Sequence, residues 1–259
     1  FSYREFLEYY HMENNEKSFD AYVLEGGLAG SYLYKEQDEK YNYVNNVYNT
    51  LIKRDICNKY NIKKDYLLDM INNFLMENIS NLISIRDIAD TLTNNKDKIN
   101  HKTVSSYINY LCNAFLFYKI RRYDIQGKKY LASQDKYYLV DHSFKYAKLG
   151  TKNINYGRLY ENIVAMELLR RGYELYVGTL YEKEIDFVAT RRNEKIYIQV
   201  SSDIGDDFEN NTFKREVESL LKIKDAYPKI LIARTRHDAY LFEGIQIVDI
   251  SSWLLQDNC

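Results

Sequence analysis

What the chain lacks narrows the classes of protein it can belong to. It has three cysteines, Cys57, Cys112 and Cys259, and no two of them are spaced as Cys-x-x-Cys. An odd number of scattered cysteines argues against a disulfide framework and a zinc site, and it favours a reducing compartment. No apolar run is long enough to cross a bilayer, and no signal peptide is visible. These absences predict a cytoplasmic protein without a membrane partner.

The chain also lacks a phosphate-binding loop. No G-x-x-x-x-G-K-[ST] sequence occurs, because Gly127-Lys128 has no glycine at the required earlier position. We therefore expect this chain not to hydrolyse ATP. The sequence begins at Phe1 without a methionine, which predicts a fragment of a longer protein.

What is present is typical of a globular protein. Hydrophobic residues make up 46% of the chain and charged residues 28%, with a formal net charge of −1. Tyrosine occurs 27 times and proline once, a bias that we attribute to an AT-rich genome rather than to RNA binding. The length of 259 residues suggests one to three domains.

The most informative pattern lies in the second half of the chain. Residues 156–171 repeat apolar side chains at spacings of three and four, as an amphipathic helix does, and Gly172 ends that helix. The predicted apolar stripe consists of Leu159, Ile163, Met166 and Leu169. Residues 173–178 predict a strand, and the segments EIDFVA, TRRNE and KIYIQVSS predict a hairpin of two more strands.

This hairpin brings an acid beside an amide. With the turn centred on Arg192 and Asn193, Asp186 lies directly across from Gln199, with their Cβ atoms about 5 Å apart. Alternation along each strand sorts the other residues by face. It predicts Glu184 and Val188 on the side of Asp186, Ile185 and Phe187 on the opposite side, and Tyr197 and Ser201 on the side of Gln199.

The outline resembles the core of PD-(D/E)XK nucleases, which has a helix with a glutamate, a strand with an aspartate and a strand with (E/Q)-x-K. The matching positions here are Glu161, Asp186 and Gln199. The resemblance implies Asp186 and Gln199 as metal ligands and Glu161 as a supporting acid. Carboxylate and amide oxygens suit Mg²⁺ or Mn²⁺ rather than zinc. Such a metal stabilises charge on a phosphate and generates hydroxide from bound water.

One part of the nuclease pattern is missing. The expected lysine is Ser201, whose short and neutral hydroxyl cannot replace an ammonium group. An active enzyme would need a lysine from another position, and the candidates are Lys195, Lys214 and Lys222. We expect the fold to be retained and cleavage to be lost, because fold alone does not imply function. The plain alternative is that Asp186 and Gln199 are ordinary polar residues of half-exposed strands.

Three helices and a hairpin are predicted in the middle of the chain. Residues 65–78 form the first helix, Ser84 caps the second, and TVSSYINYLCNAFLFY forms the third. FYKIRRYDI, QGKKY and KYYLVD follow as short strands around a turn at Gly127. This is the order of a winged helix, which places one helix in the major groove of DNA. The solvent face of that helix would carry His101, Lys102, Ser105, Ser106 and Asn109.

Basic residues gather in and after this hairpin. Residues 117–152 contain three acidic side chains and nine basic ones: Lys119, Arg121, Arg122, Lys128, Lys129, Lys136, Lys145, Lys148 and Lys152. Such a surplus is what phosphate contacts need. The residues expected to bind DNA are Lys102 on the helix and Arg121, Arg122, Lys128 and Lys129 on the wing. The alternative is a winged helix that serves only for packing, with lysines that keep it soluble.

The two ends of the chain add further elements. Ser2 and Glu5 match a capping box at the start of a helix, and residues 41–60 predict another helix. Near the C-terminus, residues 212–225 predict an amphipathic helix, KILIAR and GIQIVDI predict strands, and SSWLL predicts a helical turn capped by Ser251. Trp253 is expected to anchor the core.

These elements predict the fold class α/β plus all-α. The expected domains are a helical segment at 1–60, a winged helix at 61–150, and a PD-(D/E)XK-like α/β sandwich at 151–259.

Several segments together resemble one family, the prokaryotic AAA-type ATPases with a C-terminal domain of unknown function, family 4143. The segments are SYREFLEYY, EGGLAG, IKRDI, TVSSYINYLCNAFLFYKIRRYDIQGKKY, KYYLVDHSFKYA, GRLYENIVAMELLRRGYELYVG, EIDFVA, IYIQVSS and LLKIKDAYPKILIA. The Gly-Gly loop lacks a proline that is common in that family. The resemblance covers nearly the whole chain, and it implies that ATP binds only to an N-terminal half absent from this sequence.

Three functions stay open at this point. The first, which we favour, is a regulatory region that couples an upstream ATPase to DNA through a winged helix and an inactive nuclease-like domain. The second is an active Mg²⁺-dependent DNA nuclease with a relocated lysine. The third is a protein–protein interaction module without nucleic-acid binding.

Overall fold

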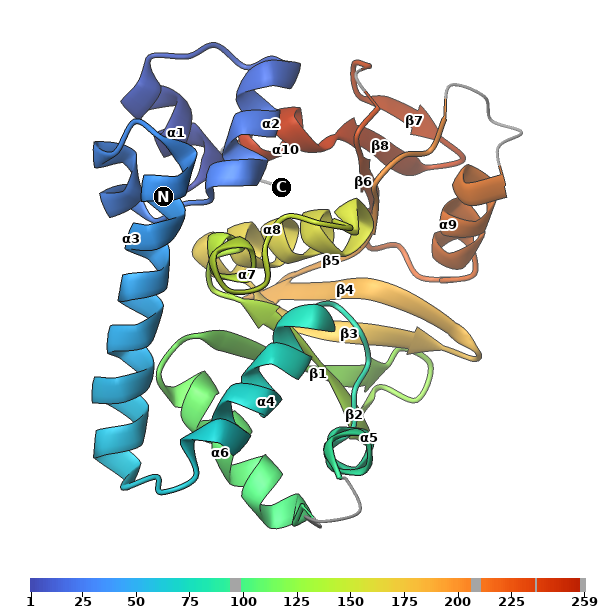
Figure 1. Ribbon diagram of the computed structural model, residues 1–259. Helices are drawn as coiled ribbons and strands as arrows, with labels where there is room; N and C mark the ends of the chain where they lie inside the picture. The colour runs from blue at the N-terminus through green and yellow to red at the C-terminus, as the bar shows by residue number, and fades with distance from the viewer. Residues whose placement is uncertain (94–98, 206–210, 236, 257–259) are drawn as a thin grey trace. The chain divides into compact units, whose positions relative to one another are not determined.

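The computed structural model describes residues 1–93, 99–205, 211–235 and 237–256 (Figure 1). It is a mixed α/β protein, which confirms the coarse fold class. Cys259 lies outside these residues, and Cys57 and Cys112 are free thiols. In the part of the chain that is described, no helix is long and apolar enough to span a membrane.

The chain divides into two compact units. The first contains Phe1, residues 21–119 and residues 133–153, and the second contains residues 2–20, 120–132 and 154–259. This grouping differs from the expected linear division at residues 60 and 150, because the N-terminal segment packs against C-terminal elements. The Arg4 guanidinium donates to the carbonyl of Leu255, and Arg234 pairs with Asp20 at 2.5 Å.

The first unit is mainly helical. Its elements are the end of α2 (Glu16–Glu25), the 3-10 helix η1 (Ala29–Leu33), α3 (Gln37–Thr50), the π-helix η2 (Leu51–Asn58), α4 (Asp65–Glu77), α5 (Ile85–Leu92), α6 (His101–Asn113) and α7 (Ser143–Leu149). It also contains the start of β1 (Phe117–Asp124) and the end of β2 (Lys129–Leu139). The helix expected over 41–60 is therefore an α-helix that continues as a π-helix.

Local sequence signals set the ends of several helices in this unit. The Oγ atom of Ser84 accepts from the Asp87 N–H, and the Asp87 carboxylate accepts from the Ser84 N–H, so the predicted cap is a complete capping box. Helix α4 ends at Glu77, one residue before the prediction. Ile83, just before α5, forms an isolated antiparallel bridge with Asp135 of β2.

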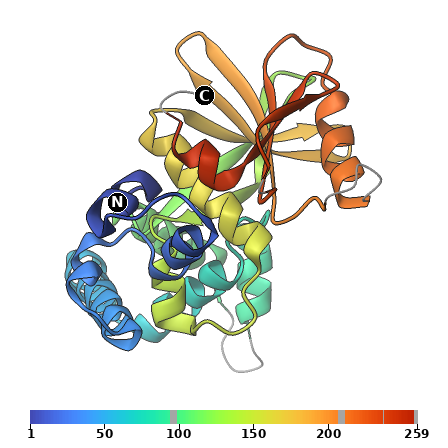
Figure 2. The ribbon, with the colours of Figure 1, turned by 90° about the horizontal axis from the view of Figure 1, so that it is seen from above.

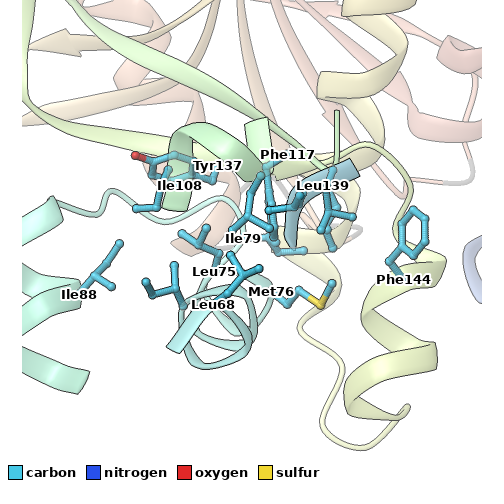
Figure 3. Close-up of a cluster of buried hydrophobic side chains, with 14 of the residues drawn as sticks. Leu68, Leu75, Met76, Ile79, Ile88, Ile108, Phe117, Tyr137, Leu139 and Phe144 are labelled. Carbon is cyan, nitrogen blue, oxygen red and sulfur yellow. The ribbon is translucent and has the colours of Figure 1, made fainter. Parts of the chain in front are cut away.

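One apolar cluster holds the first unit together. Figure 3 shows Leu68, Leu75 and Met76 of α4 in one cluster with Ile108 of α6 and Leu139 of β2. All five side chains are almost completely buried. The helical period of three and four places Leu68, Leu75 and Met76 on one stripe of α4.

The second unit contains the sheet. Its elements are α1 (Tyr3–Tyr10), the start of α2, the end of β1, the start of β2, α8 (Tyr156–Arg170), β3 (Glu174–Leu180), β4 (Lys183–Arg191), β5 (Glu194–Ser201), α9 (Asn211–Leu221), β6 (Lys229–Ala233), β7 (Tyr240–Phe242), β8 (Ile245–Asp249) and α10 (Ile250–Leu254). Within the described residues, eight strands form one sheet in the order β2-β1-β3-β4-β5-β6-β8-β7. The pairs β1–β3, β5–β6 and β6–β8 are parallel, whereas β3–β4, β4–β5 and β7–β8 are antiparallel.

Helices α8 and α9 lie on opposite faces of this sheet, as Figure 2 shows from above. Phe213, Val217 and Leu220 of α9 pack in a cluster with side chains of β4, β5, β6 and β8. Helix α8 contacts β3, β4 and β5. The sheet core is therefore covered on both faces, which explains why β4 and β5 bury most of their residues in both orientations.

Two predictions about helix details were wrong. Met166 and Leu169 are only half-buried, while the acids Glu161 and Glu167 are buried, because α8 is covered on more than one side. Helix α10 is capped by Asp249, whose Oδ1 accepts from the backbone N–H groups of Ser251 and Ser252, and not by Ser251.

Candidate functional site

The hairpin of β4 and β5 has the predicted register. Arg191 pairs with Glu194 and Phe187 pairs with Ile198, so the two-residue turn is Arg192-Asn193. Arg192 adopts the left-handed conformation with φ of 52°. The next residues beyond the last ladder pair are Asp186 and Gln199, and the structure therefore brings these two predicted site residues together.

Asp186 and Gln199 each bind the other strand's backbone. The Asp186 N–H donates to Gln199 Oε1 at 3.2 Å, and the Val200 N–H donates to Asp186 Oδ2 at 2.8 Å. Both residues are buried, with 6% and 8% exposure. These side chains continue the connection between β4 and β5 where the regular ladder stops, so they have a structural role that needs no metal.

A third residue, Glu216 of α9, completes this network. Gln199 Nε2 donates to Glu216 Oε2 at 2.7 Å, and the guanidinium of Arg215 donates to Glu216 Oε1 at 2.7 Å and 3.1 Å. Sequence reasoning missed Glu216. Its spacing of three from Phe213 and four from Leu220 places an acid on the buried face of an amphipathic helix, and that signal could have indicated a polar partner inside.

A β-bulge at Asp186 changes the predicted faces of β4. Tyr176 pairs with Val188 but Gly178 pairs with Ile185, so Asp186 and Phe187 together oppose the single residue between them on β3. Ile185 and Val188 consequently belong to the same apolar cluster under α9. The prediction that they lie on opposite faces was wrong, because the extra residue shifts the alternation by one.

Glu161 lies on α8 and is buried. Among the described residues, no three His, Cys, Asp or Glu side chains are close enough to hold a metal ion. Glu161, Asp186 and Glu216 therefore do not form a three-carboxylate site. The oxygens that could bind Mg²⁺ or Mn²⁺ are those of Asp186 and Gln199, with Glu216 next to the amide.

The candidate replacement lysines have other contacts or surroundings. The ammonium of Lys222 pairs with Glu218 at 2.7 Å, and that of Lys195 lies over the Tyr227 ring at 4.7 Å. Lys195 is four strand residues from Gln199, which corresponds to about 13 Å. Lys214 is exposed on α9. Ser201, at the position where the pattern expects lysine, donates from its hydroxyl to the carbonyl of Asp203 at 3.0 Å.

The predicted wing is part of the sheet. Strand β1 pairs in parallel with β3, with Arg121 beside Tyr176 and Arg122 beside Val177. Neighbouring residues of a strand face opposite ways, so Arg121 and Arg122 lie on opposite faces of β1. Arg122 also donates from Nε to the Thr179 hydroxyl at 3.3 Å.

The other expected DNA-binding residues are accessible. Lys128 lies in the hairpin turn with φ of 49°, Lys129 starts β2, and Lys102 lies in the first turn of α6; all three are exposed. The basic surplus of residues 117–152 is smaller on the surface than in the sequence. Lys136 is buried, Lys119 pairs with Asp135, and Lys148 pairs with Asp69.

A polar pocket of about 310 Å³ opens beside the carboxyl ends of β6 and β8. This edge of a parallel sheet is where open α/β folds bind ligands. The pocket is lined by Asn14, Asn15, Glu16, Phe19, Arg234, His237, Asp238, Asp249, Ser251 and Ser252. Arg234 is held by Asp20 and by the Tyr160 hydroxyl, and Asp249 caps α10, so these two charged groups serve the packing of the second unit.

Replacing Asp186 by alanine should lower the free energy of unfolding by about 1–3 kcal/mol in EDTA, because the buried Val200 N–H loses its acceptor. Asp186→Asn keeps an oxygen there and should retain most of the stability. Urea unfolding followed by the fluorescence of Trp253, the single tryptophan of the sequence, measures both variants. An Asp186→Ala protein as stable as the original would refute the structural role.

Comparison with known proteins places the chain among relatives of similar sequence. A family model described as "Domain of unknown function (DUF8612)" matches residues 16–155. An uncharacterized protein of Haemophilus influenzae is 36% identical over 259 residues, which cover 98% of this chain and 63% of the relative. An uncharacterized protein of Methanocaldococcus jannaschii, MJ1544, is 24% identical over 212 residues, or 80% of this chain and 47% of the relative.

The chain thus spans less than two thirds of the length of these two relatives. No solved structure matches it. Because the family model covers more than half of the sequence, the chain belongs to the DUF8612 family, a domain of unknown function.

Proposed function

We propose that this chain is a DNA-binding accessory region of a longer P-loop ATPase, and that its second unit is a PD-(D/E)XK-like nuclease fold that no longer cleaves. The observation that carries the proposal is the use of Asp186 and Gln199 to bind the backbone between β4 and β5. The order of a helix with Glu161, a strand with Asp186 and a strand with Gln199 supports the nuclease-like fold.

The loss of cleavage follows from the chemistry at the lysine position. Phosphodiester hydrolysis in such a site needs a cation that orients water and neutralises charge. Ser201 supplies a neutral hydroxyl, which is already directed to the Asp203 carbonyl. A bound Mg²⁺ or Mn²⁺ would supply Lewis acidity, and Asp186 with Gln199 would hold it. Without an ammonium beside them, these ligands are expected to bind a metal without supporting turnover.

The DNA-binding part of the proposal rests on the first unit and on the hairpin. Helices α4, α5 and α6 followed by β1 and β2 have the element order of a winged helix. The N-terminal turn of α6 presents Lys102, and the hairpin turn presents Lys128 and Lys129. Phosphate contacts from such exposed cations fix a protein on DNA without reading sequence. The proposed upstream partner is the ATPase half that the family 4143 resemblance implies.

Incubation of the purified chain with supercoiled and single-stranded DNA, with Mn²⁺ or with EDTA, tests this function. We expect no nicking in either condition. We also expect DNA retention that weakens steeply as salt rises, because several lysines and arginines release counterions. Asp186→Asn is the matched control, since it removes the carboxylate charge while keeping the hydrogen bond to Val200 N–H. Nicking that needs Mn²⁺ and disappears in this variant would overturn the loss of cleavage.

The active-nuclease alternative has one observation in its favour. Glu216 adds a second carboxylate beside Gln199, so the network has more oxygen ligands than the sequence pattern indicates. The same nicking assay tests this alternative. If the chain nicks DNA, the missing cation would have to come from a lysine such as Lys214. A chain that neither nicks nor retains DNA would instead favour a protein partner.

A further inference from the structure

Three tyrosines gather on one part of the sheet in the second unit. The ring centroids of Tyr130 and Tyr176 are 5.2 Å apart, those of Tyr123 and Tyr130 are 5.8 Å apart, and those of Tyr123 and Tyr176 are 5.9 Å apart. The rings come from β2, β1 and β3, three neighbouring strands. We call Tyr123, Tyr130 and Tyr176 the tyrosine cluster.

The strand register places this cluster on the face of the sheet that α9 covers further along. Tyr176 pairs with Val188, and Val188 pairs with Tyr197, so these three side chains share a face. Val188 and Tyr197 pack in the apolar cluster with α9. Tyr123 and Tyr176 pack against the same apolar cluster, so these two rings of the tyrosine cluster are fixed to the core.

Gly178 shapes the floor beside the tyrosines. A Cβ atom at this position would lie 2.9 Å from the Ile125 side chain and from those of Ile185 and Val188. The glycine therefore lets Ile125 insert from the end of β1 and anchor the hairpin turn. The hairpin is held on the sheet, and Tyr130 remains 64% exposed above the two supported rings.

Cations lie around the tyrosine cluster on the same face. Arg121 is exposed and two residues from Tyr123, so it shares that face of β1. Lys195, paired across from Thr190, has its ammonium 5.9 Å from the Tyr123 ring centroid. Two acids lie near these groups: Glu174 is hydrogen-bonded to the Tyr176 hydroxyl, and Asp225 accepts from the hydroxyl of Tyr197 on the same face. Lys128 and Lys129 at the adjoining hairpin turn add two exposed cations, and Asp124 accepts backbone N–H groups of that turn.

We propose that the tyrosine cluster, with Arg121 and Lys195 beside it, is a stacking platform for single-stranded nucleic acid. This proposal deepens the DNA binding proposed above and rests on it. An exposed aromatic ring on a fixed base binds any unpaired base through its π-face, while neighbouring cations bind the phosphates. The bases of a duplex are already stacked on each other, so the same surface offers a duplex only its cations. The charge of the surface and its aromatic composition together select a single strand.

The platform also lies close to the nuclease-like residues along the sheet. Strand β3 separates β1 from β4, so Tyr123 of β1 and the bulge at Asp186 are about 10 Å apart across the strands. Tyr123 pairs with Gly178, and Gly178 pairs with Ile185, the residue before Asp186. The platform therefore lies two strand spacings from the buried Asp186–Gln199 end of the hairpin.

Fluorescence anisotropy of the full chain with a labelled oligothymidylate of about twelve nucleotides, and with a duplex of the same length, tests the platform. We expect tighter binding of the single strand. Tyr130→Leu should weaken single-strand binding about tenfold, whereas Tyr130→Phe should keep it, because phenylalanine retains the stacking ring. Arg121→Gln should reduce the slope of log affinity against log salt by about 0.7. Tyr66→Leu, at an exposed tyrosine of α4, is the matched control and should bind normally.

The outcomes separate this proposal from the proposed function. If the chain binds duplex as tightly as single strand, or if Tyr130→Leu binds like the original protein, the platform is refuted and DNA binding stands. Equal losses in Tyr130→Leu and Tyr130→Phe would also refute stacking. If neither oligonucleotide binds, both the platform and the DNA-binding function fail.

Discussion

Replacing Glu167 by leucine is expected to lower the free energy of unfolding by about 3–5 kcal/mol. Glu167 accepts hydrogen bonds from Arg171 Nε at 2.6 Å and from the guanidinium of Arg170. The side chains of Glu167 and Arg171 are each only 4% exposed. Arg171 also donates to the Trp253 carbonyl and lies over the Trp253 ring at 4.3 Å. Removal of the carboxylate would leave a buried guanidinium charge without its counter-ion.

A second variant shows whether the uncompensated charge is the cause. Glu167→Leu combined with Arg171→Met removes both charges and should recover part of the lost stability, because apolar replacements of a whole buried pair are often tolerated. Asp90→Ala breaks the exposed pair between Arg86 and Asp90 and should change stability by no more than about 1 kcal/mol. Urea unfolding followed by Trp253 fluorescence measures the first two proteins, and circular dichroism measures the third. A double variant no more stable than Glu167→Leu would contradict the explanation.

The second large effect is expected in the helical unit. Leu75 is completely buried at the centre of the cluster in Figure 3. Leu75→Ala should lower the free energy of unfolding by about 2–5 kcal/mol, because the removed methyl groups leave a cavity among residues of three helices. Urea unfolding followed by far-ultraviolet circular dichroism measures the change.

The same helix offers a matched control for this prediction. Tyr66 of α4 is 50% exposed, and Tyr66→Ala should change the stability by no more than about 0.5 kcal/mol. A loss of similar size in both variants would indicate a change in helix propensity rather than a cavity. An unchanged stability in Leu75→Ala would show that the cluster around α4 does not hold the unit together.

Short-range patterns were reliable guides in this chain. The capping box at Ser2 and the N-cap at Ser84 form as predicted, because each joins residues three positions apart. The register of β4 and β5 also follows from its two-residue turn, which fixes every pair in the ladder. The juxtaposition of Asp186 and Gln199 was therefore predictable, although its functional role stays a prediction.

Two contacts that the sequence did not indicate come from packing between segments far apart in the chain. The insertion of β1 beside β3 joins residues more than fifty positions apart. The hydrogen bond between Gln199 and Glu216 depends on where α9 packs on the sheet. Neither contact leaves a periodic signal in one segment, because each depends on two segments that meet only in the folded chain.

By itself, the sequence determined the types and approximate ends of most elements and the acid–amide pair at the open end of the β4–β5 hairpin. The tertiary structure decided that this pair binds backbone, that a bulge reverses the faces beside it, and that the predicted wing becomes part of a sheet carrying exposed tyrosines. Helix ends and turns are determined by residues close together in the sequence, whereas the partners of a buried polar group depend on the packing of the whole unit.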